Sequence, residues 1–167
     1  RVMDILQQSN ESGIQPDDGL DETYQEIKNQ FKRFVNEEIT PNAHEWHIND
    51  DYIPLEIIKK MSDLGVFGLT IPEEYNGLGL EKKAMCIVSE ELSRGWVGVG
   101  SLGTRSEIAA ELILIGGTEE QKQKYLPKIS NGEIFPTAVF SEPDIGSDLA
   151  HLKTRGSVKG NKYLING

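Results

Sequence analysis

A loop near the end of the chain combines hydroxyl groups, backbone amides and a fixed turn. Ser141 follows an apolar run, and Glu142-Pro143 sets a turn, because proline fixes its own φ and restricts the residue before it. Gly146 allows a ligand to approach the backbone closely, and Ser147 adds a second hydroxyl beside it. Two hydroxyls and several amides at the end of a strand suit a phosphate group or the polar edge of a ring. The alternative is a tight turn in which Asp and Ser side chains cap the backbone locally.

Other motifs of known enzymes give little evidence for a catalytic or metal site in this sequence. The sequence has no Walker phosphate loop, no His-Glu-x-x-His and no Gly-x-Ser-x-Gly. His44 and His47 are three residues apart and can share a helical face near Trp46, but a metal site there needs further ligands. We therefore interpret both histidines as surface residues and predict no metal site.

The charge of the chain argues against two classes of partner. Lys plus Arg number 17 and Asp plus Glu number 27, which gives a formal net charge of −10 over 167 residues. Nucleic acids and anionic membranes both require a basic surface. No apolar run approaches the ~18 residues of a membrane span. The single cysteine, Cys86, excludes an internal disulfide and favours a reducing compartment, so we expect a cytoplasmic protein.

The elements before the loop have helical periodicity. Apolar residues at three- and four-residue steps predict helices over about 21–40, 54–65, 81–93, 106–115 and 118–129. We expect Thr40-Pro41 to stop the first helix, Gly65 to cap the second, and Thr118 to open the last through a capping box with Gln121. The helix over 106–115 is apolar on nearly all sides, which predicts that it is buried.

After Gly132 the apolar period changes from 3.6 to 2. Residues 133–140 are predicted as a strand, and 152–158 and 162–165 as two strands joined by a turn at Lys159-Gly160-Asn161. The expected fold class is α+β, with a linker over 1–20, a helical domain over 21–132 and the start of a β domain over 133–167. A strand followed by Asn-Gly normally turns into another strand, so we expect the chain to end inside a β unit.

Three spaced segments resemble the acyl-CoA dehydrogenase family. Residues 141–148, Ser-Glu-Pro-Asp-Ile-Gly-Ser-Asp, are similar to its flavin loop, usually written Thr-Glu-Pro-x-x-Gly-Ser-Asp. Residues 65–79 resemble a loop that follows an early helix of the family, and residues 117–127 resemble the helix that leads into its β domain. The resemblance covers about residues 21–167 in the right order.

A narrower resemblance concerns the substrate. Residues 89–95 and 98–112 are similar to the methylsuccinyl-CoA dehydrogenase branch, which acts in the ethylmalonyl-CoA route of bacterial carbon assimilation. That branch carries an extra N-terminal region, which would explain the residues before about 21. The implied reaction is the α,β-dehydrogenation of a short branched or dicarboxylic acyl-CoA, from methylsuccinyl-CoA to mesaconyl-CoA.

The resemblance also implies an architecture and partners. The family has an all-α domain, a middle β-barrel and a C-terminal four-helix bundle, of which this chain would hold the first and the opening of the second. FAD lies between barrel and bundle, usually in a homotetramer, and electrons leave to electron-transfer flavoprotein. The catalytic base is a glutamate of the C-terminal bundle. No residue of this chain is therefore assigned as catalytic, and the fragment alone is expected to be inactive.

Site residues follow from the resemblance one by one. The positions expected to bind FAD are Ala138, Phe140, Ser141, Gly146 and Ser147. Ser141 replaces the usual Thr, so the hydroxyl remains available without the methyl group that restricts its rotamer. Phe140 presents its backbone, while Gly146 and Ser147 lie by the pyrophosphate. Ser147 also meets the CoA part of the substrate.

Arg105 is a separate candidate for substrate binding. It lies near the helix that walls the acyl pocket in the family, and a guanidinium is the best partner for the free carboxylate of a dicarboxylic acyl group. The alternative is a surface pair with Glu107 or another acid.

Two other functions remain open at the level of the sequence. An acyl-CoA oxidase or another flavin relative of the same fold would use oxygen as its acceptor. A non-catalytic helical interaction module would keep the fold without taking up flavin.

Overall fold

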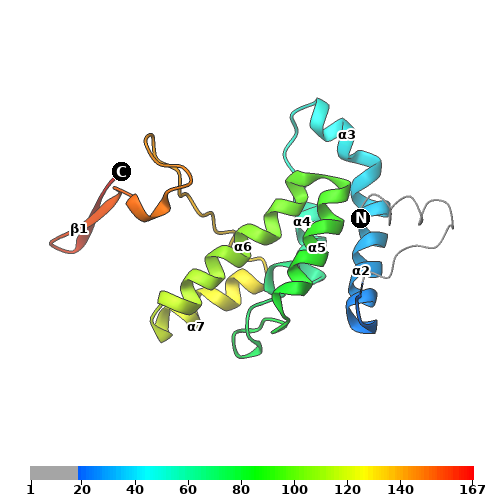
Figure 1. Ribbon diagram of the computed structural model, residues 1–167, viewed down its shortest axis with the longest axis horizontal. Coiled ribbons are helices and arrows are strands. Elements are labelled where there is room, and N and C mark those ends of the chain that lie inside the picture. The colour runs from blue at the N-terminus through cyan, green and yellow to red at the C-terminus, as the bar shows by residue number, and fades with distance from the viewer. Residues whose placement is uncertain (1–18) are drawn as a thin grey trace, which may run out of the picture.

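The computed structural model describes residues 19–167 as a helical body followed by an extended segment and a hairpin (Figure 1). In chain order the helical elements are α2 (Glu22–Phe34), η1 (Val35–Ile39), α3 (Thr40–Ile48), α4 (Leu55–Asp63), η2 (Val66–Gly68), η3 (Glu73–Tyr75), α5 (Lys82–Gly95), α6 (Val97–Gly116), α7 (Glu119–Ser130) and η4 (Leu149–His151). The strands are β1 (Arg155–Lys159) and β2 (Lys162–Asn166). The predicted linker over 1–20 lies outside the described residues, except for its last two positions.

The first predicted helix does not stop where its proline suggests. Asp21 caps α2 by accepting a hydrogen bond from the Tyr24 amide at 3.0 Å, and the helix then passes through the π-helical segment η1. The Thr40 amide donates to the Val35 carbonyl, five residues back. Pro41 falls in the first turn of α3, where its missing N–H is not required. The prediction that Thr40-Pro41 ends the helix is therefore wrong, because one wide turn accommodates the proline.

The helical body has one main core and one smaller core. The main core joins α2, η1, α4 and α5 through buried apolar side chains: Phe31, Phe34, Val35, Ile39, Ala43, Ile57, Met61, Val66, Phe67, Leu69, Met85, Val88, Leu92 and Val99. The smaller core joins η3, α6 and α7 through Ile71, Tyr75, Ala110, Leu126 and Ile129. The capping box predicted at Thr118 and Gln121 is confirmed, and so is the left-handed Gly65, at φ 78°, after α4.

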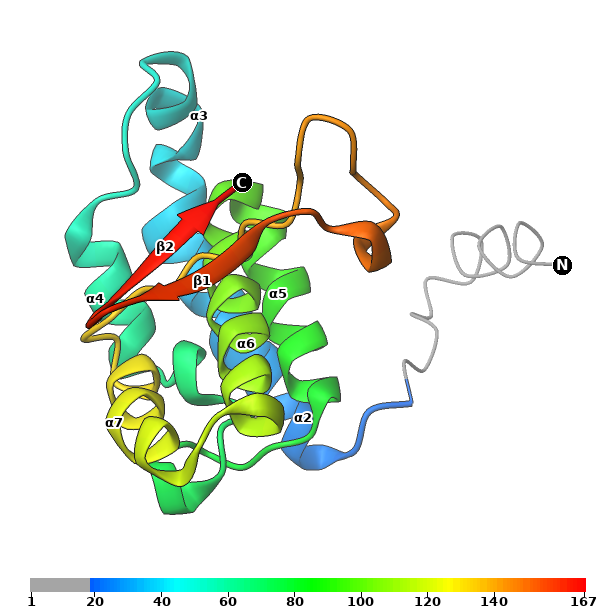
Figure 2. The ribbon, with the colours of Figure 1, turned by 90° about the vertical axis from the view of Figure 1, so that its left-hand side faces the viewer.

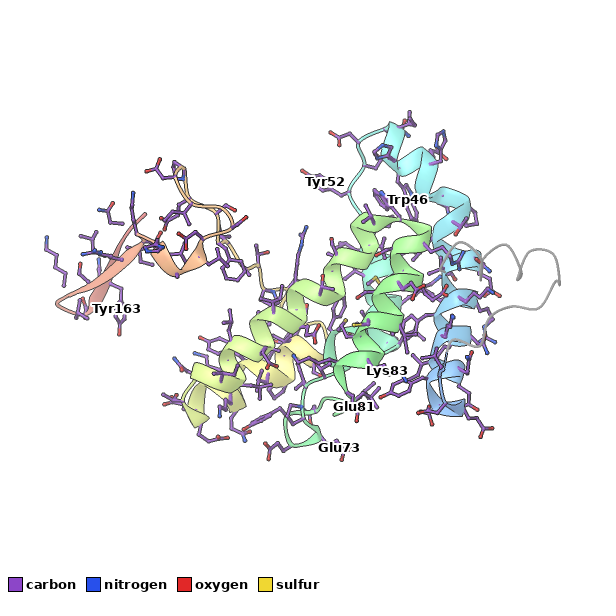
Figure 3. The ribbon with its side chains drawn as sticks, in the orientation of Figure 1. Trp46, Tyr52, Glu73, Glu81, Lys83 and Tyr163 are labelled. Carbon is purple, nitrogen blue, oxygen red and sulfur yellow. The ribbon has the colours of Figure 1, made fainter. Side chains whose placement is uncertain are left out.

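Polar contacts also tie α2 to α5. The Tyr24 hydroxyl donates to the Glu81 carboxylate at 3.3 Å, and the Lys83 ammonium lies 4.6 Å from the centre of the Tyr24 ring. Glu81 and Lys83 mark this end of α5 in Figure 3. At the other end of the body, Trp46 and Trp96 pack as a tilted pair with ring centroids 5.7 Å apart.

Helix α6 is longer and more exposed than predicted. It begins at Val97 rather than near Ser106, and it lies side by side with α5 in Figures 1 and 2. Ile108, Leu112 and Ile115 are 41%, 56% and 78% exposed. The prediction of a buried helix is wrong for the described residues, because α5, α7 and η2 cover only one side of α6. In residues 19–167, no helix has the length and apolar character needed to cross a membrane.

The region after α7 contains less sheet than predicted. Residues 134–140 are extended but form no strand, because no described segment lies beside them to pair with their backbone groups. The strand predicted over 133–140 is therefore wrong. Phe135 instead packs its ring against Phe67 of the main core, with centroids 5.1 Å apart.

The hairpin itself is confirmed. β1 and β2 pair antiparallel with Lys159 opposite Lys162, and Gly160 adopts φ 63° in the turn (Figure 2). The first strand starts at Arg155 rather than Leu152, because the Lys153 and Thr154 amides donate to the Glu142 carboxylate instead of to a neighbouring strand. Every residue of both strands is exposed, including Tyr163, which Figure 3 labels. A helical domain followed by a short two-stranded sheet agrees with the expected α+β class.

Candidate functional site

The candidate site is the loop formed by residues 141–148, which we call the serine loop. Glu142 and Ile145 form an isolated antiparallel bridge with two backbone hydrogen bonds, of 2.9 Å from the Glu142 amide and 3.1 Å from the Ile145 amide. Pro143 and Asp144 form the corner between them. Ile145 is buried although its neighbours are exposed, so the bridge anchors the loop.

The bridge places the two serine-bearing arms of the loop next to one another. Because Glu142 faces Ile145 in an antiparallel pair, Ser141 and Gly146 are the next opposed positions. An ideal Cβ on Gly146 would have no atom within 4 Å, so the backbone there is open to a ligand. In the part of the chain that the structure describes, the hydroxyls and amides of Ser141 and Ser147 and the amide of Gly146 form no hydrogen bond.

Residues 138–140, which precede the serine loop, are extended. Ala138 and Phe140 are half-buried, while Val139 between them is 84% exposed, so the first two share one face of the segment. A cleft of about 430 Å³ borders the loop. It is lined by Val139, Ser141, Glu142, Pro143, Leu152, Thr154 and Gly167.

One side chain holds the loop against the entry to β1. The Glu142 carboxylate accepts hydrogen bonds from the Lys153 amide at 2.9 Å, from the Thr154 amide at 2.8 Å and from the Thr154 hydroxyl. These bonds, that of the Thr154 hydroxyl foremost, hold the pKa of Glu142 below its ordinary value. The Lys153 ammonium also pairs with Asp144 at 3.2 Å.

The acids and serines of the loop therefore have different roles. Asp148 pairs with the His151 ring nitrogen at 2.6 Å, and Asp144 pairs with Lys153. Neither serine caps the turn, so the alternative reading of local serine capping does not describe this loop. The hydroxyls of Ser141 and Ser147 and the amide of Gly146 remain without a partner in the described chain, so they can donate to oxygen or nitrogen acceptors of a ligand.

Arg105 is exposed and belongs to α6 of the helical body, not to the segment that carries the serine loop. Glu107, its suggested partner, instead accepts from Lys82 at 3.6 Å, and Lys82 also pairs with Glu111 at 3.2 Å. Among residues 19–167, Arg105 forms no ion pair. The structure does not bring Arg105 to the serine loop, but it leaves the guanidinium available on an otherwise apolar helix face.

Two other sequence features do not form sites in the described chain. His44 and His47 are exposed on α3, and no group of three or more His, Cys, Asp or Glu side chains in residues 19–167 is arranged to hold a metal ion. Gly98, Gly100 and Gly103 have the Gly-x-Gly-x-x-Gly spacing of a dinucleotide loop, so an expectation that the sequence lacks this motif is wrong, but the three glycines lie inside α6. Gly100 and Gly103 have a packing role, since a Cβ would fall 2.0 Å from the Ser93 hydroxyl oxygen at Gly100 and 3.0 Å from a Val66 methyl carbon at Gly103.

Sequence reasoning missed the residues that support the loop. Glu142 was assigned only to the turn, and Lys153 and Thr154 were assigned to a strand. The contacts join residues 11 and 12 positions apart through an irregular segment, so no periodicity indicates them.

Comparisons with known proteins identify the family. Residues 21–133 match the family model described as acyl-CoA dehydrogenase, N-terminal domain. The chain is 58% identical over 149 residues to (2S)-methylsuccinyl-CoA dehydrogenase of Cereibacter sphaeroides, which covers 89% of this chain and 27% of that protein. It is 36% identical over 151 residues to the mitochondrial isovaleryl-CoA dehydrogenase of Pongo abelii, with 89% and 36% coverage.

A solved structure agrees with this assignment. The glutaryl-CoA dehydrogenase of Mycobacterium smegmatis in complex with FADH2 matches with a TM-score of 0.80 and 28% identity, over 89% of this chain and 38% of that chain. The chain thus spans about a quarter to two fifths of the length of these relatives. Because the family model matches more than half of its residues, the chain belongs to the acyl-CoA dehydrogenase family.

Proposed function

We propose that this chain is part of an FAD-dependent acyl-CoA dehydrogenase that converts methylsuccinyl-CoA to mesaconyl-CoA. The observation that carries the proposal is the serine loop, which has an open glycine and two serines whose hydroxyls have no partner among the described residues. The 58% identity to a methylsuccinyl-CoA dehydrogenase supports the choice of substrate within the family. A less specific form of the same proposal is that the substrate is a short branched or dicarboxylic acyl-CoA.

The donors of the loop fit FAD. Its isoalloxazine edge and its diphosphate present acceptors, and Ser141, Gly146 and Ser147 offer hydrogen-bond donors that no described residue uses. The Ser141 hydroxyl would donate to the ring edge, and the amides of Gly146 and Ser147 would lie by the diphosphate. Ala138 and Phe140 would present their backbone to the ring. When bound, FAD supplies the hydride acceptor of the reaction.

The remaining substrate contacts involve two residues of this chain. Ser147 would also meet the CoA part of the substrate. Arg105, which has no ion pair among the described residues and is flanked by exposed Ile108 and Leu112, would bind the free carboxylate of the methylsuccinyl group. The proton-abstracting base belongs, on this proposal, to a C-terminal bundle, and no glutamate of this chain takes that role.

The wider setting follows from the family resemblance. The complete protein would be a cytoplasmic homotetramer of the ethylmalonyl-CoA route that passes electrons to electron-transfer flavoprotein. The acidic net charge of −10 supports the expectation that nucleic acid is not a partner.

The test uses the full-length protein. It should purify with bound flavin, and anaerobic methylsuccinyl-CoA should bleach the flavin absorbance. Bleached enzyme that is reoxidised by electron-transfer flavoprotein, and only slowly by air, supports the dehydrogenase. Rapid reoxidation by air would indicate an oxidase, and a colourless protein that takes up no added FAD would indicate a non-catalytic module.

Arg105→Leu tests the substrate assignment. The change should lower kcat/KM for methylsuccinyl-CoA about a hundredfold, because a buried carboxylate would lose its charged partner. It should affect an unsubstituted acyl-CoA such as butyryl-CoA severalfold at most. An equal decrease of kcat/KM for both substrates would show that Arg105 does not bind the carboxylate.

A further inference from the structure

The serine loop has few supports of its own. The strands that follow it are fully exposed, and residues 134–140 before it pair with no described strand. The hydrogen bonds and ion pairs that hold its geometry in the described chain lie within residues 141–154. Among these, the Glu142 carboxylate has the largest number of hydrogen-bond donors: two backbone amides and one hydroxyl.

The two oxygens of the Glu142 carboxylate accept all three of these hydrogen bonds. One oxygen accepts from the Lys153 amide, and the other accepts from both the amide and the hydroxyl of Thr154. An ionised carboxylate only accepts, so all three contacts are satisfied together. A glutamine at this position would keep one carbonyl oxygen but would direct an NH₂ group at a backbone N–H.

The Glu142 carboxylate also determines where the proposed FAD contacts lie relative to β1. Glu142 belongs to the bridge with Ile145, and the residues next to that bridge are Ser141 on one arm and Gly146 on the other. The bridge keeps the two arms together, and the carboxylate holds both of them against Lys153 and Thr154, so release of Glu142 would move the arms together relative to the entry to β1. These groups are assigned to one ligand, so the position of the loop has to be maintained before the ligand arrives.

We propose that Glu142 is a positioning residue that holds the serine loop in the shape that receives FAD, without contacting FAD itself. The inference rests on the proposed function for the identity of the ligand, but the contacts that hold the loop exist in the chain without it. The Lys153–Asp144 pair is a weaker second tie between the same segments, because both side chains are mostly exposed.

The first measurement does not involve FAD. In the full-length apo-protein, Glu142→Gln should speed hydrogen exchange of the Lys153 and Thr154 amides about tenfold or more, because both lose a charged acceptor. Glu133→Gln is the matched control, since Glu133 pairs with the Lys128 side chain outside the loop. Unchanged exchange at Lys153 and Thr154 would overturn the proposed clamp.

The second measurement is the affinity of the apo-protein for FAD, followed by quenching of flavin fluorescence. Glu142→Gln should raise the Kd about tenfold while the urea midpoint stays at the wild-type value, and Glu133→Gln should leave the Kd unchanged. Thr154→Val, which removes one donor, should weaken binding in the same direction and to a smaller extent. The double variant should be weakened less than the product of the two single effects, because both changes break one contact.

The outcomes separate the two proposals. A wild-type protein that binds no FAD overturns the proposed function. A wild-type protein that binds FAD, together with a Glu142→Gln variant of equal affinity, overturns only the role of Glu142. Fully multiplicative effects of Glu142→Gln and Thr154→Val would also overturn it, since they would show that the two side chains act independently.

Discussion

The helical body, residues 22–130, and the C-terminal segment, residues 134–166, are stabilised in different ways. The body buries its apolar side chains in two cores shared by several helices. Among residues 134–166, all of which the structure describes, Ile145 is the one buried apolar residue, and both strands are exposed throughout. The segment therefore depends on backbone pairing and on a few charged contacts.

This difference predicts whether a mutation will change the stability of the whole unit or only its own neighbourhood. In a cooperative core a local defect lowers the free energy of unfolding of the whole unit. In a segment held by separate polar contacts, a defect opens only its own neighbourhood. The proposed cofactor contacts lie in the second kind of region, so loss of binding there need not involve loss of folding.

The largest expected effect comes from the residue that connects the two regions. Phe67 is 2% exposed in the main core, and its ring also packs against Phe135 of the extended segment. Phe67→Ala should lower the free energy of unfolding by about 3–5 kcal/mol, measured by urea denaturation, through the cavity that it leaves. Tyr163→Ala on the hairpin is the control and should change it by about 0.5 kcal/mol or less, since that side chain is 78% exposed.

A glycine-to-alanine change in each region tests the same contrast between the helical body and the C-terminal segment. Gly100→Ala should destabilise the body by about 1–3 kcal/mol, because its Cβ would lie 2.9 Å from the Ser93 amide nitrogen and 3.0 Å from the Ser93 Cα, where α5 and α6 pack. Gly156→Ala in β1 meets no atom within 4 Å and should be neutral or slightly stabilising. Equal effects of the two changes, measured by thermal unfolding, would contradict the described packing of α5 on α6.

The parts of the fold that the sequence predicts are those governed by local rules. The capping box at Thr118, the left-handed Gly65 and the turn at Gly160 each depend on a few neighbouring residues, and the structure has all three. The serine loop was located in the same way, through its Pro and Gly residues and its resemblance to a family motif.

The parts that it does not predict depend on partners distant in sequence. Helix α6 starts at Val97 in spite of its glycines, because the missing side chains of Gly100 and Gly103 let α6 pack closely on α5 and η2. An alternating pattern over 133–140 indicates an extended chain, but only a neighbouring strand makes it a strand. The contacts of Glu142 join residues 11 and 12 positions apart and leave no pattern in the sequence.

A smaller effect is expected at the start of α7. The Thr118 hydroxyl accepts from the Gln121 amide at 3.3 Å, and the Gln121 side chain accepts from the Thr118 amide at 2.8 Å. Thr118→Ala should lower the free energy of unfolding of the body by about 1 kcal/mol, whereas Thr118→Ser keeps the hydroxyl and should cost little. If alanine and serine unfold at the same urea concentration, the capping box contributes nothing measurable.

The smallest effect on global stability is expected from acidification of the serine loop. Hydrogen bonds from Thr154 and Lys153 lower the pKa of Glu142 in the folded chain, so the stability that they contribute is present above the ordinary glutamate pKa of about 4.3. It is lost as the pH falls through the lower, folded pKa, because a protonated carboxyl is a poorer acceptor. Hydrogen exchange of the Thr154 amide, corrected for its intrinsic pH dependence, should accelerate in that range.

Acidification should also distinguish the serine loop from the helical body within one sample. Amides of the main core, such as that of Val88, should keep their protection over the pH range in which Thr154 loses it, because Glu142 has no contact with the core. In Glu142→Gln the step at Thr154 should disappear, since no carboxyl remains to titrate there. A step that persists in that variant would assign the titration to another group. Simultaneous loss of protection at Thr154 and Val88 would show that the loop and the body unfold together.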